Sequence, residues 1–305
     1  MNDWQNNSQL ITLPHSGYRV FTKDLGDSTA TSQRTLLLLH GFPESSFSFN
    51  KVVAGLQQQF DRVVLLDMLG YGFSDKPDTV YSYSLIEQAD AALRMWRVLG
   101  ISGGHILSHD MGTSVLTELV SRQVNEMLPA WFPSGFHNFT FTNGSMVLGL
   151  AKLRVMQRLL LTRFGATIGQ ATSYRTFRSA VLSAHGADSA SGHGLQESDV
   201  MGLWENVNLQ DGQFKAHLTI RYLHDRRRFE ESRWLSALGV AGKQTPVHIC
   251  WGDADAVARI EMARYLKNTV CPDATLTVMP GVGHFCQLGS PELWLENVNA
   301  FYQQL

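Results

Sequence analysis

Cysteine is scarce in this sequence, and the few cysteines are not spaced as pairs. The chain has 3 cysteines among 305 residues, Cys250, Cys271 and Cys286. Their number is odd and no two of them form a CxxC pair, which argues against both a disulfide framework and a zinc site. The first residues, 1–7, are polar and do not read as a secretory signal. We therefore expect a cytoplasmic protein that binds no metal.

Neither sign of charge is in excess. Lys and Arg together number 25 and Asp and Glu together number 27, which gives a formal net charge of −2. Such a balance provides no strongly basic surface for a polyanion. Nucleic acid is therefore not an expected partner, whereas a homo-oligomer stays open.

Long apolar runs are also missing. The most apolar stretch of the later chain, residues 146–161, is interrupted by Lys152, Arg154 and Arg158. Charges at these positions would be costly at the centre of a bilayer, so the stretch predicts an amphipathic helix and no stable membrane insertion is expected. With 44% hydrophobic and 17% charged residues, the composition is that of an ordinary globular protein.

The sequence does contain short apolar runs that are separated by helix-compatible stretches. The runs occupy residues 35–40, 62–67, 104–108, 139–143, 247–251 and 275–279. Helical stretches such as 83–99, 113–123 and 261–267 lie between them. Alternation of this kind predicts an α/β fold with a mostly parallel, doubly wound sheet.

The alternation stops between residues 146 and 235, where strand-like runs are scarce and helix-compatible ones follow one another. This interval predicts a helical cap inserted into the core. We therefore expect a core domain built from residues 1–145 and 236–305, and a cap domain of residues 146–235.

Residues 108–112 (Ser-His-Asp-Met-Gly) stand between a predicted strand and a predicted helix. Small residues lie two before and two after Asp110, which is the spacing of a nucleophile elbow, where backbones crowd at a sharp turn. The usual elbow has a serine at its apex. An aspartate there can attack an electrophilic sp3 carbon without first losing a proton.

An acid and a histidine follow in the chain order that such a site requires. Residues 251–255 (Trp-Gly-Asp-Ala-Asp) end a predicted strand, so Asp255 or Asp253 is the candidate acid. His284 lies between glycines and a phenylalanine in the loop after the last predicted strand, and it is the candidate base. The spacing after Gly252 in the family that these motifs resemble, named below, favours Asp255.

These residues together predict a two-step hydrolysis. Asp110 would form an alkyl ester, and His284, oriented by Asp255, would activate water to attack that ester. The second step creates an oxyanion that needs preorganised N–H donors. We assign the backbone N–H groups of Met111 and Phe42 to this oxyanion hole.

The motifs resemble the α/β-hydrolase superfamily over nearly the whole chain, through residues 40–43 (His-Gly-Phe-Pro), the 67–77 stretch, the elbow, and the Asp255 and His284 loops. An Asp elbow together with a His-Gly-Phe-Pro loop looks like epoxide hydrolases, in which two cap tyrosines protonate the epoxide oxygen. The resemblance implies this role for Tyr222. Tyr174 is the nearest candidate for the second tyrosine, although it lies further from the elbow than the family pattern places it.

Other branches of the superfamily share parts of the pattern. The late cap, residues 197–234, is similar to the mesoderm-specific transcript branch. Haloalkane dehalogenases share the Asp elbow but typically have Trp after the nucleophile, where this chain has Met111. Fluoroacetate dehalogenases place arginines there to hold a carboxylate. A dehalogenating hydrolase and a non-catalytic ligand-binding member therefore stand beside epoxide hydrolysis of a small, mainly apolar substrate.

Three features also have ordinary explanations. Asp110 could cap the helix that follows it. Residues 70–72 (Gly-Tyr-Gly) lack the third glycine of a dinucleotide fingerprint, so no nucleotide cofactor is expected. Residues 226–228 (Arg-Arg-Arg) stand beside Glu230 and Glu231 and are interpreted as a solvated helix face.

Overall fold

The computed structural model describes residues 3–78, 80–144, 146–187 and 189–305. Its strands form one mixed sheet in the order β1-β2-β4-β3-β5-β6-β7-β8. The strands from β3 to β8 pair in parallel, whereas β1 and β2 pair antiparallel with their neighbours. Their bounds are β1 Gln9–Thr12, β2 Arg19–Gly26, β3 Thr35–Leu39, β4 Arg62–Leu66, β5 Gly103–His109, β6 Gly135–Thr142, β7 Val247–Gly252 and β8 Thr275–Met279.

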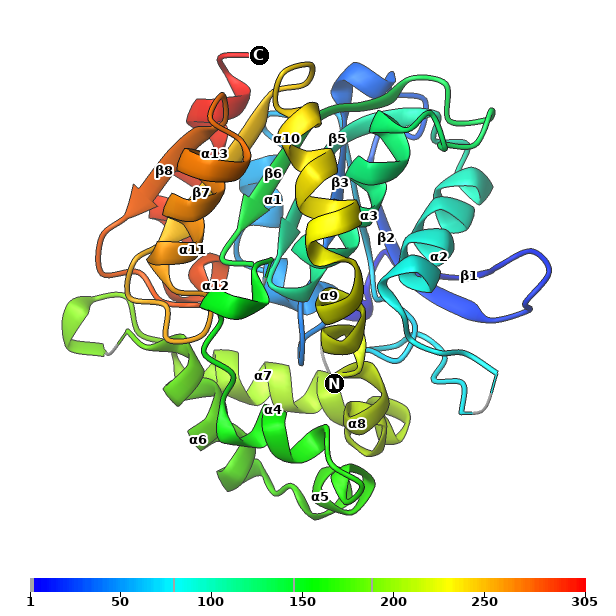
Figure 1. Cartoon of the computed structure of the whole chain (residues 1–305). Helices are drawn as coiled ribbons and strands as arrows, with labels where there is room; N and C mark the ends of the chain where they lie inside the picture. The colour runs from blue at the N-terminus through cyan, green and yellow to red at the C-terminus, as the bar shows by residue number, and fades with distance from the viewer. Residues whose placement is uncertain (1–2, 79, 145, 188) are drawn as a thin grey trace.

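The central strands are buried on both faces. On β3, Leu37 and Leu39 belong to one apolar cluster, whereas Leu36 and Leu38 belong to another on the opposite face. Successive side chains of a strand point to opposite sides, so a run of leucines has to be covered twice. Helices cover both faces of the sheet (Figure 1). The predicted doubly wound, mostly parallel α/β sheet is confirmed.

The α-helices pack in three groups. α3 contacts both α2 and α10, and α13 contacts both α1 and α12. The third group, α4 to α8, lies together at one end of the sheet (Figure 1). The bounds are α1 Val53–Leu56, α2 Leu85–Val98, α3 Met111–Val124, α4 Val155–Leu160, α5 Gly165–Ala171, α6 Tyr174–His185, α7 Glu197–Asn208, α8 Ala216–Thr219, α9 Tyr222–Phe229, α10 Ser236–Ala241, α11 Ile260–Tyr265, α12 Cys286–Gly289 and α13 Pro291–Tyr302.

Shorter helical turns join these elements. The 3-10 turns are η1 Asp3–Gln5, η2 Ser32–Arg34, η3 Ser46–Phe49, η4 Leu148–Leu150, η5 Ser189–Ser191 and η6 Leu209–Lys215. Two π-helical turns, η7 Glu230–Leu235 and η8 Leu266–Val270, continue α9 and α11.

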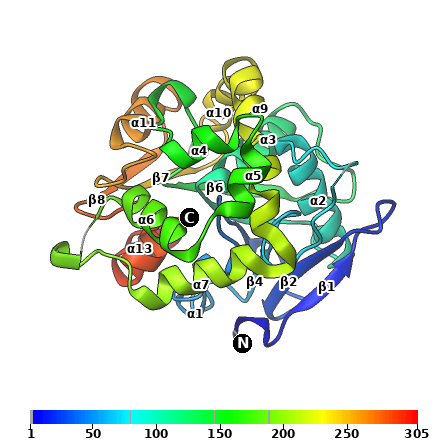
Figure 2. The same cartoon turned by 90° about the horizontal axis from the view of Figure 1, so that it is seen from below.

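We call α4 to α8 the helical layer. Figure 2 views the molecule from the side of this layer, with α4, α5, α6 and α7 in front of the sheet. The loops after β3, β5, β7 and β8 open at the carboxyl ends of parallel strands, which is where α/β proteins bind ligands. Residues from the layer and from these loops line one cavity, described below. The division into a core domain and a cap domain at residues 146 and 235 stays a prediction.

Some local expectations were wrong. β1 and β2 were not predicted, and residues 146–161 form the turn η4 and the six-residue helix α4 instead of one amphipathic helix. The three cysteines are free and buried. Within the described ranges, no helix has the length and apolarity needed to cross a membrane.

Candidate active site

Asp110 occupies the strained apex between β5 and α3. Its backbone has φ 44° and ψ −118°, a region that few residues other than glycine adopt. Gly112 explains why the turn requires small neighbours, because a Cβ there would lie 2.5 Å from the carbonyl oxygens of Leu39 and His40. The strained turn matches the elbow geometry that the spacing predicts.

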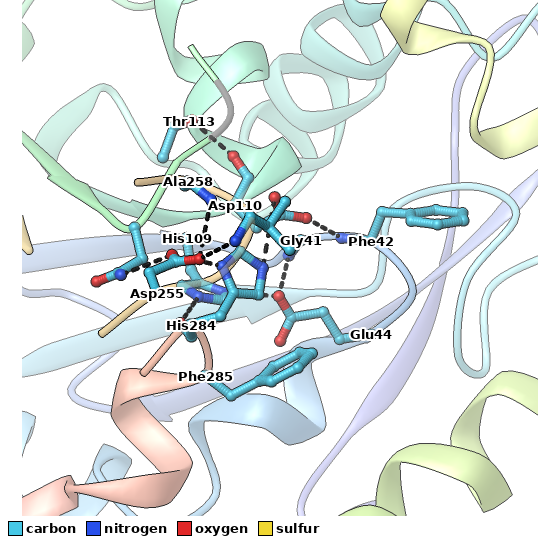
Figure 3. A network of polar contacts seen from close by, with 12 residues as sticks. Gly41, Phe42, Glu44, His109, Asp110, Thr113, Asp255, Ala258, His284 and Phe285 are labelled. Carbon is cyan, nitrogen blue, oxygen red and sulfur yellow. Dashed lines mark hydrogen bonds and ion pairs between the residues drawn. The ribbon is translucent and has the colours of Figure 1, made fainter. Parts of the chain in front are cut away.

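The Asp110 side chain does not cap α3, so the helix-capping explanation fails. Its Oδ2 accepts a hydrogen bond from the Phe42 backbone N–H at 2.9 Å. Its Oδ1 lies 3.7 Å from His284 Nε2 (Figure 3). The Asp110 side chain is buried, with a relative exposure of 3%. One oxygen is thus held by an N–H group while the other faces a histidine.

Burial raises the pKa of Asp110 above its ordinary value. The charges of His284 and His109 and the Phe42 hydrogen bond act in the opposite direction, because they favour the carboxylate. Asp110 is therefore a desolvated carboxyl whose charged form depends on its histidine neighbours. Weak solvation is what makes a carboxylate a better nucleophile.

His284 is held by Asp255. His284 Nδ1 lies 2.7 Å from Asp255 Oδ2, and both side chains are buried. Asp253, the alternative acid, instead accepts a hydrogen bond from Gly281 N–H at an exposed turn. The structure therefore brings Asp255 to His284 and keeps Asp253 away from it.

Asp255 is fixed in turn by three donors. Its Oδ1 accepts hydrogen bonds from the backbone N–H groups of Val257 and Ala258, at 2.7 and 2.8 Å. Its Oδ2 also accepts one from Asn143 Nδ2 at 2.8 Å. With every oxygen occupied, the carboxylate has a single orientation toward His284.

Burial alone would lower the pKa of His284, but Asp255 outweighs it through its charge and its hydrogen bond. The negative charges of Asp110 and Glu44 act in the same direction as Asp255, and the pKa of His284 rises to about 9. At neutral pH this imidazole is therefore protonated and lies between two carboxylates.

Of the two N–H groups assigned to the oxyanion hole, Phe42 N–H contacts the Asp110 carboxylate directly. Met111, the first residue of α3, does not donate to that side chain within the described residues. Its role stays a prediction for the transition state, in which the oxyanion would occupy a different position from the present carboxylate oxygen.

A second buried acid–histidine pair includes His109, the residue before Asp110. His109 Nδ1 is 2.5 Å from Glu44 Oε1, and both side chains are fully buried. Burial raises the pKa of Glu44, but the charge and hydrogen bond of His109 outweigh burial and bring it below its ordinary value. Gly41 N–H also donates to Glu44 at 3.0 Å. Figure 3 shows Glu44, His109, Asp110 and His284 in one continuous network.

The two candidate tyrosines have different environments. Tyr222, at the start of α9, is 1% exposed, and its ring centroid is 6.3 Å from that of Phe42. Tyr174 instead donates its hydroxyl hydrogen to Glu197, which also pairs with Arg178 at the exposed side of α6 and α7. Tyr222 therefore lies next to Phe42 of the 40–43 loop, whereas the hydroxyl of Tyr174 is not brought to the site.

An apolar cavity of about 100 Å³ reaches His284 from the helical layer. Phe42, His284 and Phe285 line it from the loops after the strands, and Phe177 and Trp204 line it from the helices. A cavity with many apolar walls and a few polar groups is typical of small-molecule sites.

Two residues of this network were missed by the sequence interpretation. Glu44 follows the 40–43 loop directly, and its position there was the available signal. Asn143 comes directly after β6, at the carboxyl end of a parallel strand, where the other site residues also lie. That position was the signal that could have identified it. The interpretation of residues 226–228 as a solvated helix face was wrong for Arg226, which is 0% exposed. Its guanidinium group lies over the Trp234 ring at 5.1 Å and donates to Thr117 at 3.2 Å. Arg227 and Arg228 are exposed, as expected.

Comparisons with known proteins agree with this geometry. A family model described as alpha/beta hydrolase fold matches residues 34–291. The chain is 32% identical over 296 residues to LipZ of Mycobacterium tuberculosis H37Rv, a protein named as a hydrolase, and the match covers 97% of this chain and 96% of LipZ. It is 28% identical over 299 residues to the mesoderm-specific transcript homolog protein of Homo sapiens, with 95% and 84% covered.

Solved structures show the same fold with different chemistries. The haloalkane dehalogenase DbeA from Bradyrhizobium elkani USDA94 has a TM-score of 0.76 at 18% identity, with 97% of both chains covered. The epoxide hydrolase CorEH has a TM-score of 0.72 at 17% identity, with 97% and 98% covered. At these identities the likeness concerns the fold, and the reaction has to be argued from the site.

Proposed function

Because this chain belongs to the α/β-hydrolase fold family and is a hydrolase, we propose that it acts through an ester formed on Asp110. Epoxide hydrolysis to a vicinal diol is the reaction that the site supports best. One observation carries the proposal: at the strained apex after β5, a buried carboxylate has one oxygen against an N–H donor and the other facing a histidine. A carboxylate in that place needs no base in order to attack carbon.

In the first step, Asp110 Oδ1 attacks an epoxide carbon and the bond from that carbon to the ring oxygen breaks. The ring oxygen takes a proton from Tyr222 and becomes a hydroxyl group. Asp110 Oδ2 becomes the carbonyl oxygen of the new ester and keeps its contact with Phe42 N–H. No leaving group departs, so the enzyme gains the whole mass of the epoxide.

In the second step, water attacks the ester carbon while His284 takes its proton. The charge that develops on Oδ2 is stabilised by the N–H of Phe42. The bond between the acyl carbon and the substrate oxygen then breaks, and the proton on His284 passes to that oxygen. The new Asp110 carboxyl group then gives the second proton of the water to His284. Epoxide and water have become a diol, and Asp110 is again a carboxylate beside a protonated His284.

The pKa of His284 supports this order of events. Its value of about 9 depends partly on the negative charge of Asp110. Ester formation removes that charge, so the pKa of His284 falls when the ester forms. The histidine is therefore protonated while Asp110 attacks. When its pKa falls it releases this proton, which replaces the one that Tyr222 gave to the ring oxygen, and His284 is then the base that activates water.

Dehalogenation through the same ester is the second candidate, because Trp204 lines the cavity and an indole N–H can donate to a halide. The residue after Asp110, however, is Met111, whose side chain carries no N–H group. Epoxide opening requires an acid at the ring oxygen instead, and the buried Tyr222 beside Phe42 is the group that favours it.

The test uses the His284→Gln variant, in which the ester should form but not be hydrolysed. It is incubated with styrene oxide or with 1-bromobutane, and intact protein and peptides are measured by mass spectrometry. We expect the mass of the whole epoxide on the peptide that contains Asp110, and diol formation by the wild type. The Asp110→Asn/His284→Gln double variant is the control for adducts elsewhere.

The outcomes separate the alternatives. A butyl adduct together with bromide release, and no epoxide adduct, would replace epoxide hydrolysis by dehalogenation. Adducts of equal amount in the double variant would mean that Asp110 is not the nucleophile. The absence of any adduct or turnover on both substrates would favour a ligand-binding protein.

A further inference from the structure

The charges of this chain are unevenly distributed. Residues 127–187 contain no aspartate or glutamate, although the whole protein has a net charge of −2. The same segment contains six cationic residues, Lys152, Arg154, Arg158, Arg163, Arg175 and Arg178. They lie on or next to α4, α5 and α6, which face the viewer in Figure 2.

These cations are mostly without carboxylate partners. In the part of the chain that the structure describes, only Arg178 among the six forms an ion pair, with Glu197. Arg158 donates to the Leu153 carbonyl oxygen, which leaves its charge uncompensated. An unpaired group of cations at one place attracts anions, whereas an even distribution of charge would not.

Four of the cations converge on one groove between α4 and α6. Lys152, Arg154, Arg158 and Arg175 line this groove, which has a volume of about 670 Å³. Apolar side chains share it, including Val155 and Leu159, which are 68% and 41% exposed. The groove therefore offers a positive and an apolar surface to the same ligand.

This groove continues into the cavity of the candidate active site. Arg154, Met156 and Ala180 line both the groove and the apolar cavity that contains His284. A ligand could thus have its apolar part in the cavity while an anionic group at its other end stays in the groove. The cavity itself has few polar groups that could hold an anion.

We propose that the groove between α4 and α6 binds the anionic end of an amphiphilic substrate, whose apolar chain enters the cavity toward Asp110. This rests on the proposed function, because it assigns the substrate class of the same site. The expected ligand carries a carboxylate or a similar acidic group at the end of an aliphatic chain. Guanidinium groups suit such a group because they can donate two parallel hydrogen bonds to it.

The test measures binding rather than turnover, so it is independent of the reaction on Asp110. Isothermal titration compares octanoate with octanamide, which has the same chain but no charge. We expect octanoate to bind the wild type more tightly and to lose this advantage as salt is added. The Arg158→Gln/Arg175→Gln variant should bind octanoate about tenfold more weakly, as expected for lost hydrogen bonds to a charged group, and octanamide unchanged.

Arg264→Gln is the matched control, since Arg264 is an exposed arginine of α11 that does not line the groove. Equal affinities for octanoate and octanamide would overturn the proposal, as would an unchanged preference in the double variant. Binding to phosphatidylglycerol vesicles without binding of free octanoate would also overturn it and identify a membrane-docking face. If octanoate binds as expected but His284→Gln forms no ester, the anion site stands and the proposed reaction fails.

Discussion

Glu44 Oε1 lies 2.5 Å from His109 Nδ1, behind the candidate nucleophile. The other nitrogen, His109 Nε2, is 2.9 Å from the carbonyl oxygen of His284. A carbonyl oxygen can only accept, so His109 Nε2 carries a hydrogen. Glu44 also accepts from Gly41 N–H. This pair therefore joins the loop after β3, the elbow after β5 and the loop that carries His284.

Glu44→Gln should lower the free energy of unfolding by about 2 kcal/mol, because the buried Glu44 carboxylate accepts hydrogen bonds from His109 and Gly41 that are stronger than those to a neutral amide. Urea denaturation at neutral pH measures the effect. Asp61→Asn is the control, since Asp61 pairs with Arg34 at the exposed surface and its loss should leave the midpoint nearly unchanged. Similar midpoints for the two variants would show that the Glu44–His109 pair does not stabilise the fold.

The His284–Asp255 contact predicts a specific pH dependence of stability. The pKa of His284 is about 9 in the folded protein and 6.5 in its ordinary state, so its contribution is fully present below pH 6.5 and is lost as the pH rises through 9. The contribution is about 3 kcal/mol at most. Relative to His284→Gln, the wild type should therefore lose unfolding free energy between pH 6.5 and pH 9. A constant difference across this range would contradict the raised pKa.

Asn143→Gly should slow hydrolysis of the ester by about tenfold and leave its formation unchanged, because Asn143 orients Asp255, which orients the base. Glycine is the suitable replacement, since Asn143 has φ 40°. Rapid-quench kinetics separate the two steps, and the ester should accumulate in the variant. Equal slowing of both steps would mean that Asn143 supports the whole site rather than the base.

Tyr222→Phe and Tyr174→Phe form a matched pair. Removing the Tyr222 hydroxyl should slow ester formation from an epoxide by about 100-fold, the usual contribution of a general acid. Removing the Tyr174 hydroxyl should have little effect, because this group donates to Glu197 on the exposed side of the helical layer. The rate of the first step in a single turnover measures both. A larger loss in Tyr174→Phe would reverse the assignment.

Much of the core could be predicted because it depends on short-range patterns. Buried parallel strands such as β3 and β4 read as continuous apolar runs, and the elbow is recognisable from small residues around Asp110. The resemblance to α/β-hydrolases and to the mesoderm-specific transcript branch is confirmed by the comparisons. β1 escaped prediction because only one of its four residues is buried, which leaves no periodic signal.

Contacts between distant residues could not be predicted in the same way. Glu44 and His109 are 65 positions apart, and nothing local to either residue indicates the other. Arg226 was misjudged because three consecutive arginines look solvated. Its spacing of four residues from both Tyr222 and Glu230, which places all three on one side of a helix, was the better signal. The orientation of Tyr174 depends on how α6 packs, which its sequence position does not reveal.

In the proposed reaction, oxygen reaches the product through Asp110, and a single turnover in oxygen-18 water tests this most directly. With enzyme in excess over epoxide, the first diol should contain no heavy oxygen, because its new oxygen comes from the Asp110 carboxylate. The label should instead appear in the peptide that contains Asp110 once the ester has been hydrolysed. Heavy oxygen in the first diol, with an unlabelled Asp110 peptide, would show that water attacks the substrate directly and would contradict the account.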